Sequence, residues 1–375
     1  WGIRNDLAES LIDLGSYDQA LEELNWGLGI TGASVESTRA FYLKGRALKE
    51  LGRLEEALES LKSGFAQSLV SESADDSLRL VKEINAELGV DLDIEYFDRV
   101  IEKDPDDAVA RYNRGLAHLV RGDITEANID IVDSFSRGFV LTETLGTLGY
   151  VRHKNGDISG AQGALTDSLL ENSRNPLFHA YFGELNWSLR NYAQALNYLD
   201  NANILDADLG LAYLVRAKIF MAHGLQDTAK EVLQSSAELE VPGALDYADR
   251  GAIQAALGEF DSALSDLNKS IRLNPNRSDF YDTRARIHAN IGDLESALAD
   301  FNLAVEMEPK SVDYLLNRGV LLALLGDSEG SSNDLEFAST ISIVEIPAQE
   351  DRNLSFFTFN EGDGSNEVKA RLRLK

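Results

Sequence analysis

Histidine and cysteine carry much of the metal and nucleophilic chemistry of proteins, and this chain holds few of either. It has no cysteine, which excludes disulfides, thiolate metal sites and cysteine nucleophiles. No two of its five histidines stand at metal-ligand spacing, so we expect surface or packed side chains. These histidines are His118, His153, His179, His223 and His288. The sequence therefore predicts no metal site.

Motifs for other chemistry are also missing. The chain has no phosphate-binding loop, no dinucleotide fingerprint and no His-Glu-x-x-His pair. Arg121-Gly122-Asp123 spells an adhesive tripeptide, but these residues fall where a repeated turn requires glycine followed by an acid. We therefore expect a protein that is not an enzyme, with no catalytic residue and no cofactor.

The composition limits the possible partners. The net charge of −28 opposes general nucleic-acid binding, which needs clustered Lys and Arg, and it disfavours adsorption to anionic membranes. Hydrophobic residues make up 44% of the chain, and no apolar run approaches the roughly 20 residues that cross a bilayer. We expect a soluble acidic protein.

A period of 34 residues organises most of the chain. Pairs of small residues, 12 apart, recur at this spacing: Gly115/Ala127, Gly149/Ala161, Gly183/Ala195, Ala217/Ala229, Gly251/Ala263, Ala285/Ala297 and Gly319/Ser331. Such a period is typical of stacked supersecondary units, each of which buries its apolar face against its neighbours. The chain is thus predicted to be an array rather than one compact core.

Each period predicts two helices joined by a short turn. Glycine, which adopts left-handed backbone geometry at little cost, ends the first helix at Gly15, Gly52, Gly122, Gly156, Gly224, Gly258, Gly292 and Gly326. The small residues let the two helices approach closely. A large apolar residue four positions after the Ala, such as Ile131, fills the remaining space.

Several first helices carry an arginine that an aspartate follows 16 residues later. The pairs are Arg114/Asp130, Arg250/Asp266, Arg284/Asp300 and Arg318/Asp334. Where the first position is apolar the aspartate is missing, as in Leu148/Ala164 and Phe182/Tyr198, although Arg216/Val232 breaks the rule. This linked choice predicts interhelical ion pairs.

The pattern resembles the tetratricopeptide repeat (TPR), whose Gly-x-Tyr-x-x-Ala turn stands here as Gly15, Tyr17 and Ala20. The resemblance implies an all-α, right-handed superhelix of about ten helix pairs over residues 1–345. The expected units are 1–34, 38–71, 74–107, 108–141, 142–175, 176–209, 210–243, 244–277, 278–311 and 312–345. The unit at 74–107 departs most, because Asp93 replaces the usual Ala.

The resemblance also implies that the first helices line a concave groove that binds a partner. The residues expected to face it are Arg39, Tyr42, Arg46, Lys49, Lys82, Tyr112, Leu116, Tyr150, His153, Trp187, Leu214 and Met221. The basic residues would attract an acidic end of the partner, and the others a hydrophobic stretch. Alternatively, the aromatic residues are buried against neighbouring units and the basic residues are solvated.

The ends of the chain differ from the array. Residues 346–375 lack the helical period and alternate apolar and basic residues from Val368, which predicts an extended or hairpin, β-like tail. In a capping hairpin, Phe356, Phe357 or Phe359 would pack against Leu335 and Ile341. Trp1 already lies within a repeat, so we expect the natural start, and any targeting signal, to lie upstream.

We infer a scaffold or adaptor that holds a partner peptide or helix and helps to assemble a multiprotein complex. Two alternatives stay open: a substrate-recruiting or regulatory module of a larger enzyme, and a self-assembling structural array. The oligomeric state is not predicted. The compartment also stays open, with the cytoplasm the preferred assignment.

Overall fold

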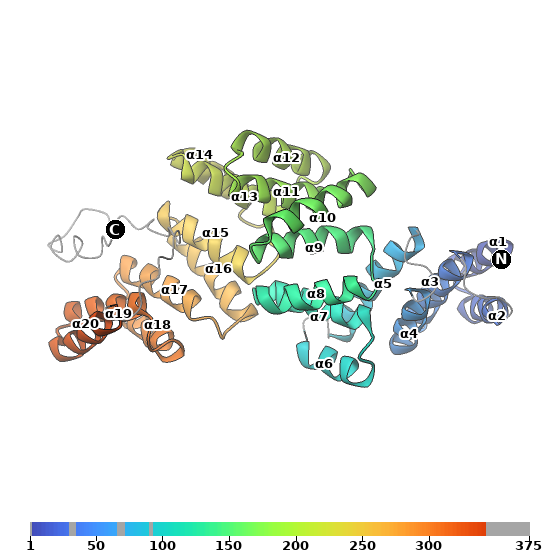
Figure 1. Ribbon diagram of the computed structural model, residues 1–375, viewed down its shortest axis with the longest axis horizontal. Helices are drawn as coiled ribbons and strands as arrows, with labels where there is room; N and C mark the ends of the chain where they lie inside the picture. Colours follow the sequence, from blue (N-terminus) through green and yellow to red (C-terminus); the bar gives the residue numbers. More distant parts are fainter. Residues whose placement is uncertain (1, 30–34, 66–71, 90–92, 343–375) are drawn as a thin grey trace. The chain divides into compact units, whose positions relative to one another are not determined.

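The described part of the chain is built entirely from helices. The structure is a computed structural model that describes residues 1–375 except 1, 30–34, 66–71, 90–92 and 343–375. The described residues form twenty α-helices and no strand (Figure 1). The all-α TPR-type fold is thus confirmed for them, whereas the predicted tail at 346–375, with its three phenylalanines, lies outside them.

The chain divides into two compact units, Trp1–Leu205 and Asp206–Lys375. The first contains α1 (Gly2–Asp13), α2 (Tyr17–Leu28), α3 (Val35–Glu50), α4 (Leu54–Phe65), α5 (Glu72–Leu88), α6 (Ile94–Lys103), α7 (Ala108–Arg121), α8 (Ile124–Ser136), α9 (Thr142–Lys154), α10 (Ile158–Glu171), α11 (Pro176–Ser188) and α12 (Tyr192–Leu205). The second contains α13 (Gly210–Ala222), α14 (Gln226–Ser235), α15 (Ala244–Ala256), α16 (Phe260–Leu273), α17 (Ser278–Ile291), α18 (Leu294–Met307), α19 (Val312–Leu325) and α20 (Ser328–Ser342).

The predicted turn glycines end the first helices as expected. All eight have positive φ, between 71° and 87°. At Gly122 (φ 82°), the glycine N–H donates to the Leu119 carbonyl and the next N–H, that of Asp123, donates to the His118 carbonyl. This arrangement satisfies the last carbonyls of α7. The adhesive tripeptide sequence therefore coincides with a helix-ending turn.

Arg190 occupies the same place in the turn between α11 and α12. Its φ is 62°, the one positive value of a non-glycine residue among those described. Left-handed geometry strains an L-residue by roughly 1–2 kcal/mol, although glycine costs unfolded-chain entropy. We expect Arg190→Gly to raise the free energy of unfolding by about 0.5–1 kcal/mol. Denaturant titration checks this, and Gly156→Arg, the reverse change one repeat earlier, should lower stability instead.

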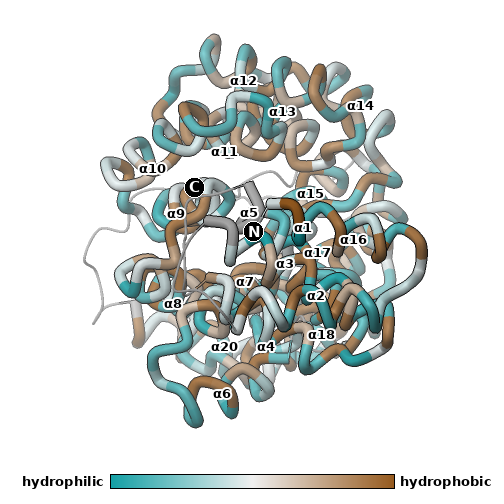
Figure 2. The backbone as a smooth tube through the Cα atoms, turned by 90° about the vertical axis from the view of Figure 1, so that its right-hand side faces the viewer, coloured by the Kyte–Doolittle hydropathy of each residue, from teal (hydrophilic) through white to brown (hydrophobic). Residues whose placement is uncertain are grey.

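Within a hairpin the small residues bring the two helices together. A Cβ built on Gly115 would lie 2.7 Å from Ile131 Cγ1, so no side chain fits there without displacement. Ala127 is 0% exposed and Ile131 1%. Hydrophobic and hydrophilic residues alternate along single helices (Figure 2), as expected when one side of each helix is buried. The predicted packing is confirmed, except that Leu335 on α20, which no described helix follows, stays 38% exposed.

Enlarging Ala127 should force this contact apart. We expect Ala127→Leu to lower the free energy of unfolding by about 1–3 kcal/mol, because the added atoms meet the α7–α8 interface. The exposed Ala193 on α12 provides the control, since Ala193→Leu adds the same atoms facing solvent. Thermal melting followed by circular dichroism compares the two. An unchanged melting temperature for Ala127→Leu would contradict the register.

The four predicted Arg–Asp ion pairs all form. Each arginine uses Nε and Nη2 to contact both carboxylate oxygens of the aspartate 16 residues later, at 2.6–2.8 Å. In three of them Nη1 also bonds the residue 16 positions earlier, on the preceding second helix: Asp98, Asn268 or Asn302. We call this three-position arrangement the arginine ladder, and it joins consecutive second helices.

The helices of the predicted unit 74–107 pack differently from the other pairs. α5 contacts α3 and α4, whereas α6 contacts α7 and lies away from α5 (Figure 1). The sequence explains why α5 and α6 do not pair. Val81 takes the position of Gly115 in the next repeat, and Asp93 takes the position of Ala127. Asp93 instead caps α6, accepting a hydrogen bond from the Tyr96 N–H. Without the two small residues, α5 and α6 cannot approach closely.

Side chains from separate repeats pack together at the junction where α5 and α6 are not paired. Phe139, in the loop after α8, is 2% exposed and lies edge-on to Phe65 of α4, with ring centroids 5.0 Å apart. Lys62 of α4 bonds Asp104 and Asp107 at 2.9 and 2.8 Å. Burial lowers the pKa of Lys62, but these hydrogen bonds outweigh it and raise the pKa above its usual value. α4 is thus anchored to the start of α7.

Candidate protein-binding surface

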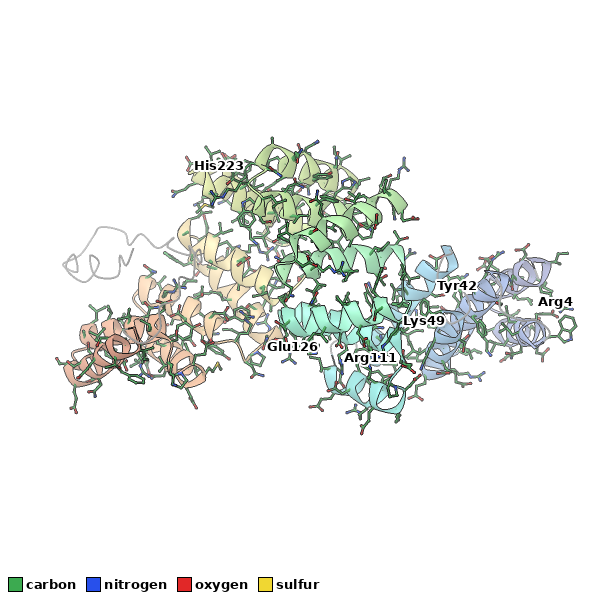
Figure 3. All side chains as sticks on the ribbon, in the orientation of Figure 1. Arg4, Tyr42, Lys49, Arg111, Glu126 and His223 are labelled. Carbon is green, nitrogen blue, oxygen red and sulfur yellow. The ribbon has the colours of Figure 1, made fainter. Side chains whose placement is uncertain are left out.

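Three of the predicted groove residues line one cleft. Tyr42, Arg46 and Lys49 lie on successive turns of α3, and Figure 3 labels the first and last of them. With residues of α5 they border a cleft of about 390 Å³. We call it the α3–α5 cleft, and its lining is Tyr42, Arg46, Lys49, Glu50, Asp76, Arg79, Leu80 and Glu83. The cleft therefore lies between two successive first helices of the array.

The predicted basic stretch is not a surplus of positive charge. Arg39 contacts Asp6 and Glu9 of α1 at 3.0 and 2.6 Å, and the hydrogen bond to Glu9 raises the pKa of Arg39. Lys82 of α5 pairs with Glu143 of α9. Each of these two cations is therefore paired with at least one carboxylate of another first helix.

The other two cations follow the same rule. Arg46 reaches Glu9 and Asp13 at 3.8 and 3.4 Å. Lys49 reaches Glu83 and Glu87 at 3.4 and 2.9 Å, and the hydrogen bond to Glu87 raises its pKa. The pairs of Arg46 are the longer ones, so they are the easier to exchange for a ligand carboxylate.

Four residues expected to offer apolar surface in the groove are buried instead. Tyr112, Tyr150, Leu214 and Met221 are between 0% and 7% exposed. The Tyr112 hydroxyl bonds Thr147 of α9 at 3.0 Å, and burial raises the Tyr112 pKa. Tyr150 stacks on Tyr181 of α11, with centroids 4.0 Å apart. The alternative of burial against neighbouring repeats is correct for these side chains.

The remaining predicted residues are partly exposed. Leu116 packs at the edge of the core, and Trp187 is the last but one residue of α11. His153 Nε2 lies 3.0 Å from Ser188 Oγ of the following first helix. These three are separate from the α3–α5 cleft, whose lining ends at α5.

Comparison with protein-family models shows to which family the chain belongs. The tetratricopeptide repeat model matches residues 5–64 and 94–132 and, in two overlapping matches, 248–309 and 283–331. The chain belongs to the TPR family. As a TPR protein it is a protein-interaction repeat module. No curated protein matches the sequence.

The chain is similar to several solved structures. A chain of the APC/C hetero-tetramer Cut9–Hcn1 is 16% identical, with a TM-score of 0.53, over 91% of this chain and 74% of that one. YrrB, a TPR protein with an unusual peptide-binding site, is 25% identical over 51% of this chain and 95% of its own, with a TM-score of 0.41. Yeast Tom70 is 12% identical over 91% and 95%, with a TM-score of 0.41.

The carboxylates that pair with the basic residues of the first helices were missed from the sequence. Arg39 and Arg46 each lie 33 residues after a partner, Asp6 and Asp13, and Glu83 lies 34 after Lys49. A search for opposite charges about one repeat apart on first helices would have found them.

Two further observations concern the described residues only. No cluster of three or more His, Asp or Glu side chains within them could hold a metal ion. Within the same part of the TPR array, no helix combines the length and apolar character that a membrane span requires.

Proposed function

We propose that this TPR protein is a non-catalytic scaffold that binds an extended segment or a helix of a partner protein in the α3–α5 cleft and so helps to assemble a multiprotein complex. The observation that carries the proposal is the cleft itself, where the partly buried ring of Tyr42 lies among charged side chains. An aromatic or aliphatic anchor surrounded by polar groups is the usual composition of a recognition site.

The charges of the cleft define the partner further. Arg79 is the most exposed of its cations, with 71% of its side chain accessible and a contact to Asp76 at 3.3 Å. Arg46 contacts Glu9 and Asp13 at the longer distances of 3.8 and 3.4 Å. A partner segment with an acidic residue beside a hydrophobic one would pair with Arg79 or Arg46 and place its apolar side chain on Tyr42. Because these pairs are near the surface, the attraction should weaken with salt.

Affinity purification with mass spectrometry tests the proposal, using the intact chain, Tyr42→Ala and Arg79→Glu. We expect the same partner to be lost with both variants. Arg53→Glu provides the matched control, because Arg53 lies before α4 and pairs with Glu56 outside the cleft. For the segment identified, Arg79→Glu should weaken binding about tenfold and make it less salt-dependent. Partners retained by both cleft variants would contradict the proposal.

A further inference from the structure

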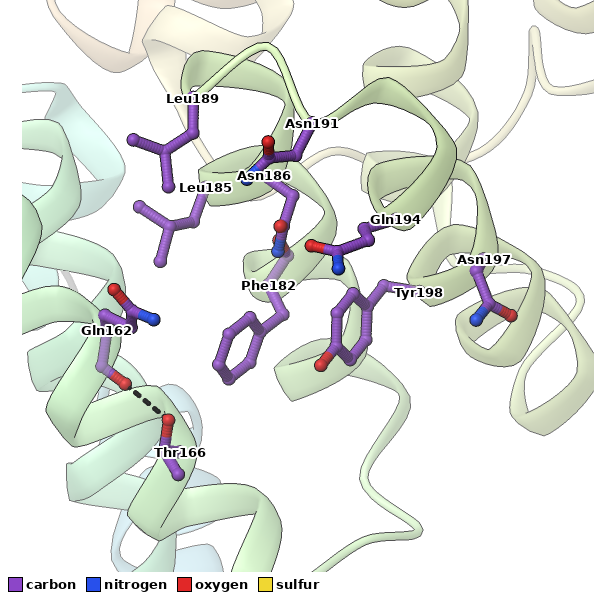
Figure 4. A pocket seen from close by; sticks show the side chains of 10 residues that line it. All are labelled: Gln162, Thr166, Phe182, Leu185, Asn186, Leu189, Asn191, Gln194, Asn197 and Tyr198. Atoms are coloured by element: carbon purple, nitrogen blue, oxygen red, sulfur yellow. Dashed lines mark hydrogen bonds between the residues drawn. The ribbon is translucent and has the colours of Figure 1, made fainter.

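A second pocket lies between consecutive second helices, away from the α3–α5 cleft. It has a volume of about 360 Å³ and is formed by α10, α11 and α12 (Figure 4). We call it the α10–α12 pocket, and its lining is Gln162, Thr166, Phe182, Leu185, Asn186, Leu189, Asn191, Gln194, Asn197 and Tyr198. Its size falls in the range of ligand pockets, about 300–1,000 Å³.

The pocket lies where the arginine ladder is interrupted. Phe182 occupies the ladder position of Arg284, while Thr166 and Tyr198 stand 16 residues before and after it. In the ladder around Arg284, the guanidinium spans from Asn268 to Asp300. Here the two rings stack on each other instead, with centroids 4.9 Å apart and planes 17° apart. An aromatic pair thus stands where the ladder around Arg284 has an arginine and an aspartate.

The neighbouring interruption of the arginine ladder has a different composition. There Val132, Leu148 and Ala164 hold the three ladder positions, and Leu148 is 2% exposed within the core. Apolar side chains thus replace the arginine and fill its place. At Thr166, Phe182 and Tyr198 the replacement keeps two polar groups at the surface, so the space stays open to solvent.

The chemistry of the lining is neutral and rich in amides. Charged residues make up 26% of the chain, yet none of the ten lining residues carries a charge. Five carboxamides surround the pocket, and those of Gln162, Gln194 and Asn197 are solvent-exposed. Each carboxamide offers two donors and an acceptor, the same groups that a peptide bond requires. Leu189, 41% exposed, provides accessible apolar surface beside them, whereas Phe182 and Leu185 are 8% and 1% exposed.

We propose that the α10–α12 pocket binds an uncharged, extended peptide segment, separate from any partner in the α3–α5 cleft. The carboxamides hydrogen-bond the main chain of the segment, and a side chain such as proline or leucine packs on the exposed Leu189. A charged ligand would lose hydration without gaining an opposite charge.

The test uses the full chain and a display library of short peptides with blocked termini that lack Asp, Glu, Lys and Arg. The comparison protein is the triple variant Thr166→Asn, Phe182→Arg, Tyr198→Asp, which copies the ladder of Asn268, Arg284 and Asp300 and should fold. We expect peptides that bind the natural chain, and a loss of affinity of about tenfold or more in the ladder-restored variant. Their affinity should be the same at about 0.05 M and about 0.5 M sodium chloride, because no ion pair contributes.

Single substitutions keep the test valid if the triple variant fails to fold. Gln194→Ala and Asn197→Ala change exposed side chains, and each should weaken a selected peptide about two- to tenfold, the value of one hydrogen bond. The control is Gln226→Ala, an exposed glutamine at the start of α14. The proposal is overturned if no peptide is enriched, if binding is indifferent to both substitutions, or if a glycan array binds at this pocket where the peptides do not.

Discussion

Replacing Asp266 with alanine should lower the free energy of unfolding by about 3–5 kcal/mol, because it leaves a buried guanidinium without its counter-charge. The side chain of Arg250 is 1% exposed and that of Asp266 5%. Their two contacts measure 2.6 and 2.8 Å, and the third arginine nitrogen, Nη1, is taken by the Leu239 carbonyl at 2.7 Å. Removing the carboxylate leaves two donor groups of the guanidinium with no acceptor and no route to water.

Denaturant titration followed by circular dichroism measures the loss, and two variants control it. Asp334→Ala removes the equivalent partner of Arg318, whose side chain is 22% exposed, so water can replace the carboxylate and the loss should be about 1 kcal/mol. The double variant Arg250→Met, Asp266→Leu removes both charges and should recover most of the stability. Equal losses of stability at Asp266 and Asp334 would show that burial does not set the strength of these Arg–Asp ion pairs.

Truncating Phe139 should cost about 3–5 kcal/mol, the usual range for a buried phenylalanine replaced by alanine. Its ring touches Phe65 on one side and Tyr112 on the other, at centroid distances of 5.0 and 5.5 Å. These residues come from α4, α7 and the loop after α8. The cavity would therefore open at the junction where the α5–α6 pairing is missing.

Hydrogen exchange locates this effect as well as measuring it. Phe139→Ala should reduce the protection of amides in α4 and α7 more than in α10, because stability in a repeat array is carried by contacts between neighbours. Phe337→Ala provides the control, since Phe337 is 46% exposed and its loss should change stability by less than about 0.5 kcal/mol. Uniform loss of protection through the first unit would show that the junction is not a local weak point.

The sequence by itself determined the features that lie within one hairpin. Gly122 and Arg190 end helices at the same place in the repeat, and Arg114 meets Asp130 in the way that Arg284 meets Asp300. The small residues of a pair stand 12 residues apart, and an arginine and its aspartate stand 16 apart. The 34-residue period places such pairs at several points along the chain. A fixed separation across one short turn leaves a single arrangement of the two helices, so the local pattern was sufficient.

Only the tertiary structure decided which side chains of different repeats meet. It placed Phe139 against Phe65, matched Lys49 with Glu83 and Glu87, and buried Tyr112 rather than exposing it in the groove. It also separated α5 from α6 and left the α10–α12 pocket open. Each of these depends on how far one repeat turns relative to the next. That rotation follows from the packing of whole helices, and a few irregular residues such as Val81 and Asp93 change it without leaving a periodic signal.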